Sequence, residues 1–106
     1  MWVVNGQELK MAEGDYGIQL PVTIEGATLG QGDAIKFVFK KSVDGELVLE
    51  KTYSSFDQNT AYLEFTAAES ALFPIGTYVY RMDWYQNGVF LCNIIPSAKF
   101  KVVNVA

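Results

Sequence analysis

Few residues of this 106-residue chain could carry out catalysis, because it contains no histidine and a single cysteine, Cys92. A Ser-His-Asp arrangement, a histidine general base and a tetrahedral Cys/His zinc site therefore have no residues from which to form. No basic residue lies near Cys92 in the sequence to lower the pKa of its thiol, and we expect it to be a small apolar residue of the core. A lone cysteine also excludes an intramolecular disulfide and fits a reducing compartment.

Acidic side chains are the other candidates for chemistry, and they occur in turns. Asp15, Asp33 and the segment 57–59 could supply oxygen ligands, but their spacing is not that of a calcium-binding loop. No two acids are paired as in a glycosidase, and no glycine-rich stretch leads from a strand into a helix as a phosphate loop requires. We therefore expect solvated turn acids, and we predict no catalytic residue, no metal ligand and no cofactor.

The charge balance disfavours two further classes of partner. Lys and Arg number 8 against 12 Asp and Glu, a net charge of −4 with a pI near 4.6, whereas a nucleic-acid partner would need a basic face. Lys36, Lys40 and Lys41 form a short basic stripe, which we interpret as a solvated or edge-protecting feature. No long apolar run and no basic-then-apolar start is present, so we expect no membrane span and no secretory signal peptide, and a location in the cytoplasm of the producing cell.

Aromatic side chains could bind a ligand by stacking. Tyr78, Tyr80 and Trp84 recur with Met82 at every second position and could form a platform for sugar rings. The same spacing is typical of the buried face of a strand. We favour core packing for this row, with the tyrosine hydroxyls reaching a carbonyl or solvent.

The candidate contact residues are Trp2, Tyr85 and one face of the segment Val89–Ile95. This segment is apolar on both faces. Under strict alternation one face packs in the core; it consists of Phe90, Cys92 and Ile94. The other face then needs a cover, from the same chain or from a partner subunit; it consists of Val89, Leu91 and Ile95.

The elements that must position these residues are short strands. Alternating apolar segments recur about every ten residues with glycines between them, a spacing typical of a β-sandwich. Asn5-Gly6, Asp44-Gly45 and Asn87-Gly88 predict hairpin turns, and Pro21 indicates that the strand over 18–24 lies at an edge or is bulged there. We predict a single domain over 1–106, an antiparallel β-sandwich of seven to nine strands.

One short helical turn is expected near 67–72. Thr66 and Glu69 have the spacing of a capping box, in which each side chain accepts a hydrogen bond from the other residue's amide. Pro74 ends the turn, because the residue before a proline avoids the helical conformation.

Several stretches carry a family resemblance. In order they are Glu13-Gly14-Asp15 before the strand 18–24, the strand 33–40 with its Asp-Gly hairpin, Leu63-Glu64-Phe65-Thr66 with the helical turn, Gly76-Thr77-Tyr78-Val79-Tyr80-Arg81, Asn87-Gly88, and Lys99-Phe100-Lys101-Val102. Together they resemble the Ig-like N-terminal domain family of baseplate upper proteins from phages of Gram-positive bacteria. The resemblance implies an immunoglobulin-like sandwich that is non-enzymatic, multimeric and part of a virion.

We therefore predict a phage or prophage virion component of the baseplate, tail or neck, which docks to copies of itself or to other virion proteins. Family members usually continue into a further region, whereas this sequence ends at Ala106, which favours a free-standing accessory domain. The alternative is a carbohydrate-binding or adhesin-like Ig module that holds a glycan through Trp2, Tyr85 or the acidic loops.

Overall fold

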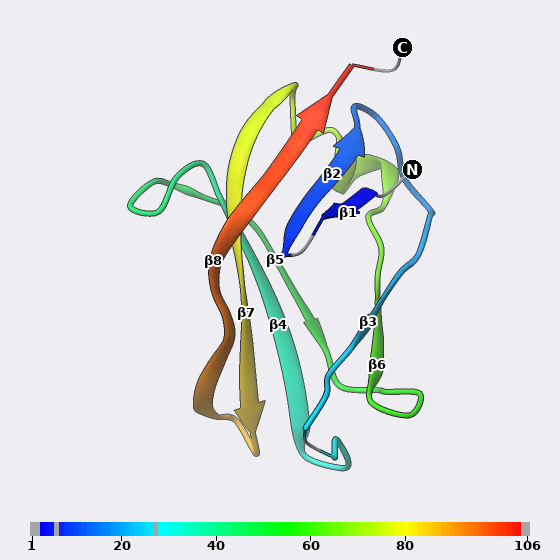
Figure 1. The fold of residues 1–106 in the computed structure, drawn as a ribbon, viewed down its shortest axis with the longest axis vertical. Helices are drawn as coiled ribbons and strands as arrows, with labels where there is room; N and C mark the ends of the chain where they lie inside the picture. Colours follow the sequence, from blue (N-terminus) through cyan, green and yellow to red (C-terminus); the bar gives the residue numbers. More distant parts are fainter. Residues whose placement is uncertain (1–2, 6, 27, 105–106) are drawn as a thin grey trace.

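The strands and the helical turn follow one another much as the alternation predicts. The computed structural model describes residues 3–5, 7–26 and 28–104, with the backbone alone for Val3–Asn5. Strands make up 57% of the described residues and helix 4%. In chain order (Figure 1) the elements are β1 Val3–Asn5, β2 Glu8–Ala12, β3 Leu20–Thr23, β4 Asp33–Lys40, β5 Leu47–Tyr53, β6 Thr60–Leu63, α1 Ala67–Ser70, β7 Gly76–Gln86 and β8 Val89–Val103.

The strands form two layers. One is a six-stranded sheet with the order β1-β2-β8-β7-β4-β5, and the other is the pair β3-β6, which lie side by side in Figure 1. Among the described strands β3 has β6 as its one neighbour, so Pro21 lies in an edge strand, the first of the two predicted alternatives. All pairs are antiparallel except β2 and β8, which run parallel. The expectation of a purely antiparallel sandwich is wrong at this pair, because side chains alternate in the same way in both kinds of ladder.

The core lies between the layers and is built on β4. Ile35, Phe37 and Phe39 are fully buried, as their alternation predicts. Phe39 is the centre of an aromatic cluster whose ring centroids lie 5.2 to 6.0 Å from its own; its neighbours are Phe65, Phe73, Tyr80 and Phe100. Residues from four separate segments thus meet on one ring, and this contact joins the two layers.

The predicted capping box is confirmed and fixes the short helix α1. The Glu69 amide donates to Thr66 Oγ1 at 3.1 Å, and the Thr66 amide donates to Glu69 Oε1 at 2.9 Å. The turn ends before Pro74 and delivers Phe73 to the core. No helix in the described part of the chain is long and apolar enough to cross a membrane.

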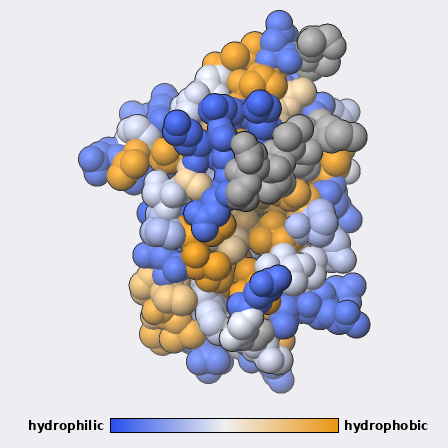
Figure 2. Space-filling model, viewed as in Figure 1, coloured by the Kyte–Doolittle hydropathy of each residue, from blue (hydrophilic) through white to orange (hydrophobic). Residues whose placement is uncertain are grey.

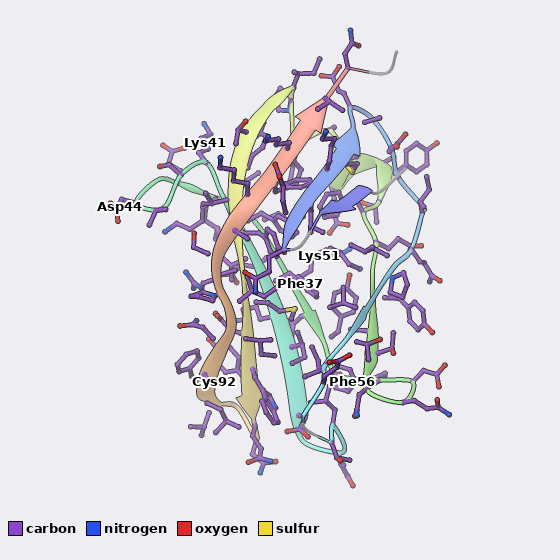
Figure 3. All side chains as sticks on the ribbon, viewed as in Figure 1. Phe37, Lys41, Asp44, Lys51, Phe56 and Cys92 are labelled. Carbon is purple, nitrogen blue, oxygen red and sulfur yellow. The ribbon has the colours of Figure 1, made fainter. Side chains whose placement is uncertain are left out.

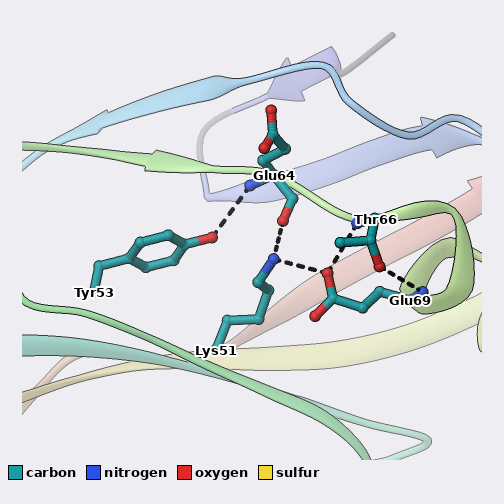
Figure 4. Close-up of polar contacts among 5 residues, drawn as sticks. All are labelled: Lys51, Tyr53, Glu64, Thr66 and Glu69. Carbon is teal, nitrogen blue, oxygen red and sulfur yellow. Dashed lines mark hydrogen bonds and ion pairs between the residues drawn. The ribbon is translucent and has the colours of Figure 1, made fainter.

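A polar bridge joins the layers beside α1 (Figure 4). Lys51, from β5, donates to the carbonyl oxygen of Glu64 and to Glu69 Oε1, the latter at 2.8 Å. The Glu64 amide in turn donates to the hydroxyl of Tyr53 at 3.2 Å. The bridge therefore ties the edge of the large sheet to the capping box of the other layer.

Two of the three predicted hairpin turns are directly described. Asn87 and Gly88 have φ values of 50° and 82° between Gln86 and Val89, which are paired, so this is the two-residue turn with left-handed central residues that an Asn-Gly pair favours. Asp44-Gly45 lies in the loop between β4 and β5, where the Gly45 amide donates to the Ser42 carbonyl. At the hairpin β1–β2, Gly6 lies outside the described residues.

Strand β8 does not follow the alternation that its sequence suggests. Its pairing with β7 shifts register at three places, after Tyr80, Met82 and Trp84, and each shift places an extra residue in β8. The residues opposite the core-facing side chains of β7 are consequently spaced by three along this part of β8; they are Cys92, Ile95 and Ala98. A bulge resets which side chain points to which face.

These bulges overturn the expected division of the segment Val89–Ile95. Phe90 lies opposite Tyr85 and outside the core, and Cys92 is exposed, so the predicted core face is wrong at these two residues. Ile94 is half-buried and packs against the core, as predicted. Ile95, expected on the uncovered face, lies opposite Met82 and packs against the core while half-buried.

Candidate interaction surface

Exposed apolar side chains gather where β7 turns into β8. Val89, Phe90 and Leu91 are 63%, 48% and 46% exposed, and Cys92 follows them on the surface. Figure 2 shows apolar residues grouped at this end of the molecule, and Figure 3 places Cys92 on the same stretch of β8. We call these four consecutive residues the tip patch. Large apolar side chains that are contiguous and exposed are typical of a contact surface.

The tip patch is uncovered because the neighbouring strand stops short of it. β2 pairs with β8 from Phe100 to Val103, whereas β7 accompanies β8 from Val89 onward. Among the described strands, residues 89–99 of β8 therefore have a ladder partner on one side alone.

The open edge of β8 is poorly suited to accept another strand. Its three bulges interrupt the regular row of donors and acceptors, and Pro96 has no amide hydrogen to donate. Bulges and proline are common protection against edge-to-edge pairing. Contacts at this end would therefore be made by the side chains of the tip patch.

Tyr85, a predicted contact residue, lies beside the tip patch and is half-buried. Its ring meets the ring of Phe90 edge to face at 5.6 Å, and Lys36 Nζ lies 4.7 Å from its centroid. These contacts fix the orientation of the ring and place a cation over it. Of the other predicted contact residues, Val89 and Leu91 belong to the tip patch, and Trp2 lies outside the described residues.

The side chains of Tyr78, Tyr80 and Trp84 pack in or against the core, as predicted, and do not form an exposed platform for sugar rings. Tyr78 and Tyr80 are buried; their hydroxyls donate to the carbonyl oxygens of Pro74, at 2.6 Å, and of Gln7. Burial raises the pKa of Tyr80 to about 12. Trp84 is half-buried and packs against the core.

Asp33 is a structural acceptor, so the expectation of a solvated acid is wrong at this residue. Its side chain is buried; Oδ2 accepts from the Gly30 amide at 2.8 Å and Oδ1 accepts from Trp84 Nε1 at 3.0 Å. The hydrogen bond from Gly30, followed by that from Trp84, holds the pKa of Asp33 below its usual value. Sequence spacing does not identify this role, because Asp33 and Trp84 are brought together by the pairing of β4 with β7.

The loop 57–59 is also a structural feature. Gln58 and Asn59 have positive φ values, and Asn59 accepts hydrogen bonds from the amides of Leu29 and Ile24 through its side chain and its carbonyl. Within the described residues, no group of three or more Cys, Asp or Glu side chains comes together that could hold a metal ion.

A second apolar feature is a groove on the side of the sandwich between β8 and β3. Its volume is about 150 Å³, and its lining includes Leu20, Phe37, Met82 and Ile95. The inward turn of Ile95 at the β8 bulges supplies one wall of the groove. The alternation pattern misplaced Ile95, and the bulges that cause this leave no clear signal in the sequence.

Comparisons of the chain with protein-family models, with curated proteins and with solved structures found no match.

Proposed function

We propose that this chain is a non-enzymatic, immunoglobulin-like docking domain that binds other proteins through its tip patch. Two observations support the immunoglobulin-like topology. The order β4-β7-β8 opposite β3-β6 corresponds to strands C, F and G opposite B and E. Tyr78, near the start of β7, donates its hydroxyl proton back to the Pro74 carbonyl, as in the tyrosine corner of such sandwiches.

The observation that carries the docking role is the tip patch itself. Val89, Phe90 and Leu91 are consecutive, are about half exposed or more, and directly follow the two-residue turn Asn87-Gly88. Apolar surface of this kind gains free energy when a partner removes it from water, by roughly 25 cal/mol per Å². The virion context is supported by the resemblance of the sequence to phage baseplate proteins, and the partner in that context is a second copy or another virion protein.

We expect Leu91→Glu to weaken association of the protein with itself. The dissociation constant should rise at least about tenfold, because the contact loses an apolar side chain and would have to bury a carboxylate. Multi-angle light scattering over a concentration series measures this change. With increasing concentration the molar mass of the wild type should rise above the 11.8 kDa of one chain, and the molar mass of the variant should stay at 11.8 kDa up to a higher concentration.

Ile75→Glu is the matched control. Ile75 is exposed and directly precedes the first residue of β7, whereas the tip patch follows the last residue of that strand. The control variant should associate like the wild type. Identical concentration dependence for all three proteins would exclude the tip patch as the contact surface, and a wild type that stays at one chain throughout would exclude self-association.

A further inference from the structure

The two outward faces of the sandwich carry charge of opposite sign. On the large sheet, the residues that alternate with the core-facing ones form what we call the front face. Six of the eight cationic residues lie on it; they are Lys10, Lys36, Lys40, Arg81, Lys99 and Lys101. Three acids share it, Glu8, Glu50 and Asp83, which leaves a net charge of +3 in a chain of net charge −4.

The layer β3-β6, with α1 and its flanking loops, forms the back face. Segments 11–35 and 52–80 supply these elements and contain no lysine or arginine. Six acids lie on this layer and its loops; they are Glu13, Asp15, Glu25, Asp57, Glu64 and Glu69. Within the part of the chain that the structure describes, the one cation that reaches this layer is Lys51, which is held in the bridge to Glu69. Lys41 and Asp44 are on the projecting β4–β5 loop, away from both faces (Figure 3).

Of the six cations of the front face, Arg81 and Lys101 form ion pairs within the described residues of that face. Lys40 donates to the Val43 carbonyl and Lys36 lies over the Tyr85 ring, and neither contact neutralises the charge. Asp83 is buried and accepts from Arg81 Nε at 2.9 Å and from Asn93 at 2.6 Å. Lys101 Nζ forms a hydrogen-bonded ion pair with Glu8 Oε1 at 2.9 Å. The pKa of Glu8 is lowered, first by that hydrogen bond and then by the nearby charges of Lys101, Lys99 and Lys10. Several lysines therefore converge on one carboxylate, and the excess is positive.

Each face also presents apolar surface. The front face ends at Tyr85 and Phe90, next to the rest of the tip patch. On the back face Tyr62 and Pro21 are exposed and lie opposite each other in the β3-β6 ladder. Both faces thus combine an apolar contact with charges, and the signs of those charges are complementary.

We propose that copies of this chain stack front to back, with the basic front face of one against the acidic back face of the next. This inference rests on the proposed docking function and specifies its partner as a second copy. Two front faces in contact would repel each other, as would two back faces, so the complementarity favours a head-to-tail arrangement over a two-fold one. A head-to-tail contact leaves one front and one back face open, so it propagates into a ring or a filament.

Charge reversal on each face tests the stacking. The front variant is Lys10→Glu with Lys99→Glu and the back variant is Glu25→Lys with Asp57→Lys; all four side chains are exposed. We expect each variant alone to associate about tenfold more weakly than the wild type in light scattering. An equimolar mixture of the two variants should regain the association, because each reversed face then meets a face of opposite sign. Salt should weaken wild-type association, since the screening length falls from about 10 Å at 0.1 M to about 3 Å at 1 M.

The back variant separates the possible outcomes. Its substitutions bring the net charge of the chain from −4 to zero, which by itself reduces repulsion and favours association. Weaker association of this variant therefore supports stacking. If the wild type associates and the back variant associates equally well, or if the mixture does not recover, stacking is overturned while docking through the tip patch stands. A wild type that does not associate overturns self-docking together with stacking. Lys41→Glu, on the β4–β5 loop, is the control and should behave like the wild type.

Discussion

Phe39→Ala should remove about 3–5 kcal/mol from the free energy of unfolding. Phe39 is 0% exposed and its ring contacts four other aromatic rings from both layers. Truncation to alanine loses these contacts and leaves a cavity that neighbours on four different segments cannot readily fill. Since a domain of this size has a total stability of roughly 5–15 kcal/mol, the variant should be partly unfolded well below the melting temperature of the wild type.

Urea denaturation followed by circular dichroism measures this loss. Phe90→Ala is the control, because it removes the same side chain from the exposed tip patch. It should change the unfolding free energy by less than about 1 kcal/mol. A loss at Phe39 no larger than that at Phe90 would contradict the assignment of the aromatic cluster as the centre of the core.

Lys51→Met should have the next largest effect and lower the free energy of unfolding by about 2 kcal/mol. The ion pair between Lys51 and Glu69 has side chains that are 17% and 24% exposed, so solvent screens it weakly. Loss of the ammonium removes its hydrogen bond to the Glu64 carbonyl and leaves Glu69 Oε1 with the hydrogen bond from the Thr66 amide but without its ion pair. Lys41→Met removes a lysine whose ion pair with Glu46 is 63% and 82% exposed, and should cost less than about 0.5 kcal/mol.

The Lys51 effect should also depend on pH. Burial acts to raise the pKa of Glu69, but hydrogen bonds from Lys51 and Thr66 outweigh it, so the pKa lies below its ordinary value of 4.5. A carboxylate with a lowered folded-state pKa contributes stability above its unfolded-state pKa and loses it as the pH falls through the folded-state value. The difference between wild type and Lys51→Met should therefore shrink when denaturation is repeated between pH 7 and pH 3, and a constant difference would contradict the bridge.

Local signals in the sequence predicted a large part of the fold. The alternation of Ile35, Phe37 and Phe39, the Asn87-Gly88 turn and the capping box of Thr66 and Glu69 all appear as expected. Each of these features is determined by interactions between residues a few positions apart, so the local sequence is sufficient to predict it.

The segment that contains the proposed docking surface is predicted less well from the sequence. Val89 and Leu91 are exposed as expected, but the side-chain period of β8 is set by bulges that form against β7, a partner strand rather than a sequence neighbour. Strict alternation therefore predicts Cys92 in the core and Ile95 on the face that needs a cover, whereas in the structure Cys92 is exposed and Ile95 packs against the core. Asp33 was misjudged for a related reason, because its main side-chain donor, Trp84, is 51 residues away.

Cys92 offers the most direct measurement of the central claim, that the tip patch is a docking surface. The Cys92 thiol is exposed in the single chain and follows Leu91 directly. Its reaction rate with a thiol reagent therefore falls when another molecule covers the tip patch. We predict that the rate per thiol falls several-fold as wild-type protein is concentrated from the micromolar to the millimolar range, while Leu91→Glu keeps the fast rate throughout. A wild-type rate that does not change over this range would contradict docking of copies through the tip patch.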